Sequence, residues 1–76
     1  MPTMIEAALK NGIIYGDNVT AEYVYMPASE IGIDPPICIF EKNNERDDIS
    51  LSKAIELVRK LSLRPTRHPA LGKSSC

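Results

Sequence analysis

The stretch that decides the fold of this chain is residues 50–63, SLSKAIELVRKLSL. Its apolar residues recur at spacings of three and four, which places one stripe on an α-helix: Leu51, Ala54, Ile55, Val58 and Leu61. Ser50 can cap the first turn. The helix should end at Arg64, because the residue before a proline is pushed out of the helical region. The sequence therefore predicts an amphipathic helix with one face to bury.

Two stretches before this helix are typical of β-strands. Residues 19–26, VTAEYVYM, place Tyr23 and Tyr25 on one side by the two-residue period, and Pro27 ends the stretch. Residues 37–41, ICIFE, are apolar on both sides, which indicates a strand inside a sheet or against a partner chain. The charged run 42–48, KNNERDD, is expected to be a solvated loop.

The first twelve residues fit two structures. Thr3 and Glu6 have the spacing of a capping box, and Gly12 can supply the left-handed residue that ends a helix. The pair Asn11-Gly12 is also the strongest short signal for a hairpin turn, with residues 13–15 following it as a strand. The sequence leaves both readings open.

These elements predict an α+β fold. We expect a small two- to three-stranded antiparallel sheet, with a C-terminal amphipathic helix packed on one face and room for a short N-terminal helix. Residues 1–64 would form this single domain. Residues 65–76, which hold two prolines, one glycine and little apolar content, would form a flexible basic tail.

Length and composition narrow the class of protein. A chain of 76 residues makes one domain with a thin core, and self-association is one way to stabilise it. No apolar run approaches the roughly 20 residues that span a membrane, and the N-terminus lacks the features of a secretory signal. Two cysteines and one histidine give no zinc-ligand spacing. We expect a cytoplasmic protein, either a homodimer or bound to a partner, without cofactor, metal or membrane.

Charge is sorted along the chain. Residues 1–52 hold three basic and nine acidic side chains, whereas residues 53–76 hold six basic side chains and one acidic one. The overall net charge of −1 hides this separation. Such a division is typical of an attachment surface, or of a tail that folds back on its own body.

The leading hypothesis is a non-catalytic interaction protein that works through protein–protein contacts. One candidate surface is an open sheet face around Tyr23 and Tyr25, because tyrosines are enriched at interfaces. The other is the basic C-terminal segment, with Arg64, Arg67 and Lys73. We predict no catalytic residue. Cys38 should be buried and inert, and His68, between Arg67 and Pro69 in the tail, is expected to have no partner that orients it.

The second hypothesis is weak nucleic-acid binding. Arg64, Arg67 and Lys73 would contact phosphates, and the affinity would fall with added salt. The tyrosine face is a poor site for a phosphate backbone, because no lysine or arginine lies between residues 11 and 41.

The third hypothesis is an oligomeric enzyme that uses Pro2. A buried N-terminal prolyl amine can act as a base of lowered pKa. In Pro2 and in length the chain resembles the small tautomerases, which use such a proline. That family opens with a strand and builds its site from basic residues of neighbouring subunits. Here residues 3–6 look like a helix start, and Lys10 is the one early basic residue.

Overall fold

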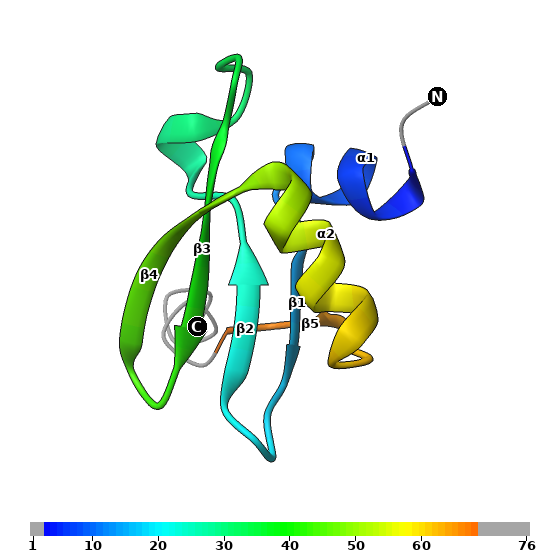
Figure 1. The fold of residues 1–76 in the computed structure, drawn as a ribbon, viewed down its shortest axis with the longest axis vertical. Helices are drawn as coiled ribbons and strands as arrows, with labels where there is room; N and C mark the ends of the chain where they lie inside the picture. The colour runs from blue at the N-terminus through cyan, green and yellow to red at the C-terminus, as the bar shows by residue number, and fades with distance from the viewer. Residues whose placement is uncertain (1–2, 69–76) are drawn as a thin grey trace.

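A computed structural model describes residues 3–68 of the chain. These residues form two α-helices, a short 3-10 helix and one five-stranded antiparallel sheet of order β4-β3-β2-β1-β5 (Figure 1). In chain order the elements are α1 (Met4–Lys10), β1 (Ile14–Asp17), β2 (Glu22–Tyr25), η1 (Ala28–Glu30), β3 (Ile37–Lys42), β4 (Glu45–Ser50), α2 (Leu51–Lys60) and β5 (Arg64–Thr66). No helix within this part of the chain is long and apolar enough to cross a bilayer.

Of the two structures that the first twelve residues allow, the helix is the one that forms, as α1. Thr3 Oγ1 accepts a hydrogen bond from the Glu6 N–H at 3.0 Å, as the capping-box spacing predicts. Gly12, with φ +88°, supplies the left-handed residue after the helix. Strand β1 then begins at Ile14, so the glycine ends a helix and is followed by a strand.

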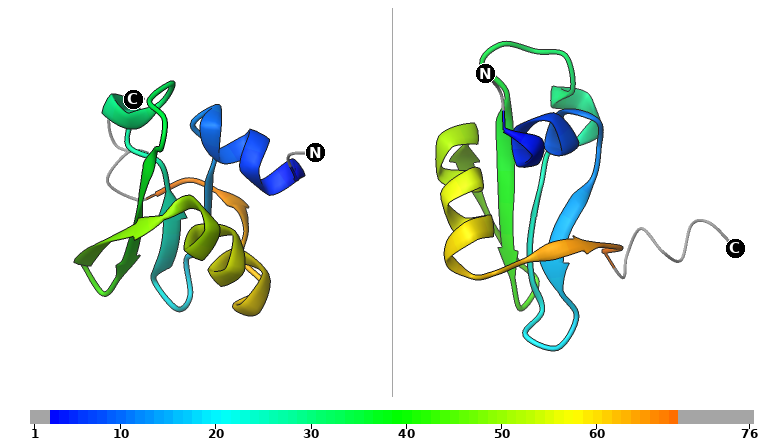
Figure 2. Two further views of the ribbon diagram at one scale, coloured as in Figure 1. Left: turned by 45° about the horizontal axis from the view of Figure 1, so that its top comes forward. Right: turned by 90° about the vertical axis from the view of Figure 1, so that its right-hand side faces the viewer.

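Helix α2 packs on one face of the sheet, as its apolar stripe predicts. Ser50 Oγ accepts from the Lys53 N–H at 3.2 Å and caps the helix. Ala54 and Val58 are buried in the core with Val24 and Cys38 of the two strands beneath. Figure 2 shows α2 on one side of the sheet, with α1 near the end of the strands.

The expected sheet of two or three strands with a C-terminal helix is wrong. The sheet has five strands, and α2 lies before β5 rather than at the end of the fold. Most of the run 42–48, expected to be a loop, belongs to β3 and β4, and only Asn43 and Asn44 form the turn. Strand β4 was missed because nearly all of its residues are exposed, so its sequence has no apolar alternation.

Strand β5 was missed for a different reason. It has three residues, one of which is Pro65. A proline argues against a central strand but is tolerated at the edge of a sheet, where β5 lies beside β1. Residues 65–68, which the sequence places in a tail, thus contribute part of a strand and a buried His68. Residues 69–76 lie outside the described part of the chain.

The hairpin of β3 and β4 has the turn expected of two strands joined by two residues. Asn43 and Asn44 have φ of +53° and +70°, as type I′ turns require. Asn43 N–H also donates to the carbonyl of Ala21 at 3.3 Å, which ties this turn to the turn between β1 and β2. The register pairs six residues, from Lys42 opposite Glu45 to Ile37 opposite Ser50.

Candidate functional site

A polar cluster occupies the sheet face opposite α2. The register places Glu41 of β3 beside Tyr23 of β2, on the side away from Val24 and the helix. Glu41 Oε2 lies 2.6 Å from His68 Nε2, and Glu41 Oε1 accepts from the Tyr25 hydroxyl at 3.1 Å and from Arg46 Nε at 3.0 Å. The carboxylate thus joins side chains of β2, of β4 and of the segment after β5. Glu41 is 3% exposed and His68 5%.

The partners of Glu41 set its protonation. Burial alone would raise the pKa of the Glu41 carboxyl. The hydrogen bonds from His68 and Tyr25, with the charges of His68 and Arg46, outweigh burial and hold the pKa below its ordinary value. The same contacts affect the phenols, because burial and the bonded carboxylate raise the pKa of Tyr25. Glu41 is therefore an anion at neutral pH, and Tyr25 is a neutral donor to it.

The ring of Tyr23 is closed off from solvent. It lies 4.8 Å from the ring of His68, centroid to centroid, and its hydroxyl donates to Asn18 Oδ1 at 2.7 Å. On the β1 side it lies over Gly16, where a Cβ atom would come within 2.2 Å of the ring. Burial, followed by the charges of Glu41 and Asp17, raises the pKa of Tyr23. At 3% exposure, Tyr23 offers almost no surface to a partner.

The other residues singled out from the sequence are distributed as follows. Tyr25 is half-buried, and the centroid of its ring lies 5.7 Å from that of His68 in an edge-to-face arrangement. Arg64 and Arg67 are both exposed, and Arg64 shares the face of Tyr23 through their common neighbour Gly16. Lys73 and Pro2 lie outside the described residues.

Sequence reasoning missed Glu41, Arg46 and His68 as neighbours of the tyrosines. Of these three residues, Glu41 had a signal in the strand pattern, because it is the last residue of the apolar stretch 37–41, which pairs with the strand that holds the tyrosines. Arg46 lies in the unrecognised β4. For His68 no local pattern exists, because its contact with Glu41 spans 27 residues and depends on β5. The expectation that no partner orients His68 is wrong.

The free edge of the sheet is the most accessible feature of the described chain. Strand β4 ends the sheet and pairs on one side only, with β3. Five of its six residues are exposed. The other edge, β5, is shorter and carries Pro65, whose missing N–H weakens it as a pairing site. The two edges are therefore unequal, and β4 is the open one.

The hairpin turn determines which backbone groups point outward from β4. A two-residue turn closes with a hydrogen-bonded pair, and hydrogen-bonded and non-hydrogen-bonded pairs alternate along an antiparallel ladder. With Lys42 and Glu45 flanking the turn, Glu45 and Asp47 face β3 with their backbone groups. The N–H and C=O groups of Arg46 and Asp48 therefore point to the open edge.

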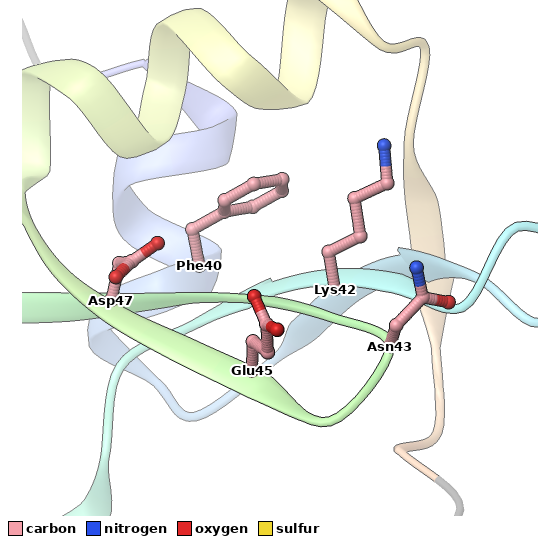
Figure 3. A pocket seen from close by; sticks show the side chains of 5 residues that line it. All are labelled: Phe40, Lys42, Asn43, Glu45 and Asp47. Carbon is pink, nitrogen blue, oxygen red and sulfur yellow. The ribbon is translucent and has the colours of Figure 1, made fainter.

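A hollow lies beside this edge, on the helix side of the hairpin. It has a volume of about 310 Å³ and is lined by Phe40, Lys42, Asn43, Glu45 and Asp47. Figure 3 shows the Phe40 and Lys42 side chains rising from β3, with Glu45 and Asp47 along β4. Phe40 is half-buried and is the aromatic residue of the lining, whereas Glu45 and Asp47 line the hollow from the edge strand.

A second, more apolar hollow of about 210 Å³ lies at the end of the sheet near η1, between Gly12, Ile14, Tyr25 and Ile31 among others. Isoleucines 13, 31, 33 and 37 are 40–50% exposed at or near this end. It is an additional apolar surface, and it lacks the open backbone groups of β4.

Nothing in residues 3–68 gathers three or more metal-ligating acidic, histidine or cysteine side chains. Comparison of the chain with protein-family models, with curated proteins and with solved structures finds no match. Function therefore has to be inferred from the geometry of this chain.

Proposed function

We propose that this chain is a non-catalytic protein-interaction module that binds an extended segment of a partner along the outer edge of β4. The observation that carries the proposal is the long exposed edge strand with outward backbone groups at Arg46 and Asp48. An extended peptide can add to such an edge as a further strand, with main-chain hydrogen bonds for affinity and side-chain hollows for specificity. The hollow beside β4 fits the second requirement.

The polar cluster supports binding rather than catalysis. Its groups are hydrogen-bonded to one another, and no buried side-chain nitrogen or oxygen in the described part of the chain lacks a partner. Neither of the two hollows described above is lined by Glu41 or His68. Burial raises the pKa of the Cys38 thiol, which makes it a poor nucleophile. A buried free thiol also suits the reducing cytoplasm, where we place the protein.

Charge argues against a second copy of β4 as the partner strand. Residues whose backbone groups point outward must lie opposite one another, so the two longest antiparallel pairings of two copies centre on Asp47 or on Asp48, and each places an aspartate opposite its own copy. Like charges directly opposite each other destabilise a strand pair. A different protein is therefore the better occupant, and self-association through β4 is an outcome that the test below can report.

The test is a selection followed by an edge-blocking substitution. A random peptide library displayed on phage is selected against the full chain, and the selected peptides are measured by fluorescence anisotropy. Asp48→Pro removes an outward N–H without touching the pairing to β3, whereas Asp48→Ala removes the same carboxylate and keeps the N–H. We expect Asp48→Pro to weaken binding by about tenfold, the equivalent of one lost main-chain hydrogen bond, and more than Asp48→Ala does.

Equal binding of the selected peptides to both Asp48 variants would overturn the proposal, as would a selection that returns no binder. Circular dichroism confirms that each variant is folded. Labelled duplex DNA and single-stranded RNA are tested at about 50 and about 200 mM salt, a range over which phosphate contacts lose affinity steeply. Salt-sensitive binding of nucleic acid, with none of peptide, would replace the proposal with the second hypothesis, contacts through Arg64, Arg67 and Lys73.

A further inference from the structure

We infer that the segment bound at β4 carries an arginine, whose guanidinium lies over Phe40 and between the carboxylates of Glu45 and Asp47. This inference rests on the proposed function and names the chemistry of the partner. It follows from three observations on the hairpin: carboxylates that form no ion pair within residues 3–68, an aromatic ring among the lining residues of the hollow, and a hollow of suitable size.

The carboxylates of β4 are not neutralised by the sheet itself. The two basic side chains of the hairpin are already engaged, Lys42 with Glu22 at 3.5 Å and Arg46 with Glu41 at 3.0 Å. Among residues 3–68, no ion pair reaches Glu45, Asp47 or Asp48. Within residues 3–68 the open edge therefore carries three acidic side chains that form no ion pair, which favours a basic partner.

Two of these carboxylates lie on the same side of β4 as the hollow. Glu45 and Asp47 are two residues apart, pair with Lys42 and Phe40, and line the hollow with them. A side chain that reaches in from an added strand would pass Glu45 and Asp47 and meet the Phe40 ring (Figure 3). Since the hollow measures about 310 Å³, it has room for one large side chain.

Arginine matches these surroundings better than lysine. Its planar guanidinium stacks on aromatic rings and offers paired donors that fit carboxylates, whereas the lysine ammonium is a compact, strongly hydrated point charge. An aliphatic or aromatic side chain could pack on the Phe40 ring, but it would leave both carboxylates desolvated without a hydrogen-bond donor.

The experiment compares three labelled peptides of twelve residues that alternate threonine and valine, with arginine, lysine or citrulline at one central position. Citrulline keeps the shape of arginine without the charge. We expect the arginine peptide to bind about fivefold more tightly than the lysine peptide and about tenfold more tightly than the citrulline peptide, as a charge-assisted pair on an aromatic face implies. Its advantage should shrink between about 50 and about 200 mM salt.

The test variant is the double substitution Glu45→Gln with Asp47→Asn. Its control is the double substitution Glu30→Gln with Glu56→Gln, which removes the same number of charges at positions outside the hollow. The first pair should reduce the arginine peptide to the affinity of the citrulline peptide, and the second should leave its advantage intact. Equal binding of the three peptides, or equal effects of the two double variants, would overturn the inference.

Failure of this inference can be separated from failure of the proposed function. Library-selected peptides that bind at β4 without an arginine would overturn the inference and leave strand addition standing. If Asp48→Pro leaves the affinity of the selected peptides unchanged, both the inference and the proposed function are overturned.

Discussion

Glu41 is the residue on which the face opposite α2 depends. Its carboxylate is bonded to Tyr25 of β2, to Arg46 of β4 and to His68 after β5, so one side chain holds three parts of the chain together. A buried carboxylate with several donors stabilises the fold only while it is charged.

Acid should therefore destabilise the fold through Glu41. The unfolded chain titrates this carboxyl near the ordinary glutamate value, about 4.3, and the folded chain titrates it lower. The stabilising contribution is then complete above the unfolded pKa and is lost as the pH falls through the folded pKa. Urea unfolding between pH 7 and pH 2.5 measures this loss.

Glu41→Gln is the matching variant. We expect it to lower the free energy of unfolding at pH 7 by about 2 kcal/mol, since it removes the charge from hydrogen bonds to a charged group. It should also lose less stability than the native chain below about pH 4.3. A variant as acid-sensitive as the native chain would show that Glu41 does not carry this pH dependence.

Gly16 is required by its neighbour rather than by its own backbone angles. A Cβ atom there would lie 2.2 Å from the Tyr23 ring and 2.8 Å from the carbonyl oxygen of Glu22. We expect Gly16→Ala to lower the free energy of unfolding by about 2–3 kcal/mol, within the range for overpacked sites. Thermal unfolding of the native and variant chains measures this difference.

The control for Gly16→Ala is Ala21→Gly. Ala21 has φ +59°, a conformation that glycine adopts without strain, so this change should cost little or increase stability. If Gly16→Ala is as stable as the native chain, the close packing of Tyr23 on β1 is contradicted.

At the scale of elements, Ser50 joins two of them. It is the last residue of β4 and the cap of α2, so the edge strand passes into the helix without a loop. We expect Ser50→Ala to lower stability by about 1 kcal/mol and Ser50→Asp to restore it, because an aspartate also accepts from the first-turn N–H groups. Chemical unfolding of the three chains measures these free energies, and a Ser50→Ala chain as stable as the native one would mean that the cap contributes nothing.

The elements that the sequence predicted are those with local signals. Thr3 and Ser50 cap helices where expected, and all of the predicted stripe except Ile55 belongs to the core or packs against it. Strands 19–26 and 37–41 were located by their apolar patterns, although β2 is shorter than predicted. Strands β4 and β5 have no such pattern, because edge strands need not alternate and a three-residue strand with Pro65 has no pattern to read.

The candidate site was less predictable for the same physical reason. The sequence placed Tyr23 and Tyr25 on one face. Their neighbours Glu41, Arg46 and His68 lie far away in the sequence, and the pairing of the strands brings them together. The β4 edge and its hollow depend on a strand that the sequence did not reveal. Sequence periodicity finds surfaces that are buried, and the β4 edge is an exposed one.

At the scale of the whole molecule, the segment after α2 completes the sheet. Strand β5 pairs with β1, and His68 meets Glu41 on the far side of β2. A chain that ends at Leu63 should therefore be less stable than one that ends at His68 by about 3 kcal/mol or more, since it leaves the Glu41 charge buried without one of its donors. Urea unfolding of the two truncated chains tests this, and equal stabilities would contradict the role given to residues 64–68.

Nuclear magnetic resonance of the labelled chain bound to a library-selected peptide shows where on the molecule the peptide lies. Strand addition at β4 predicts contacts between peptide protons and the amide protons of Arg46 and Asp48, with slowed exchange of those amides and no contacts at β5. Peptide contacts at the isoleucine-rich end near η1, or along Arg64 and Arg67, with unchanged β4 amides, would contradict the account.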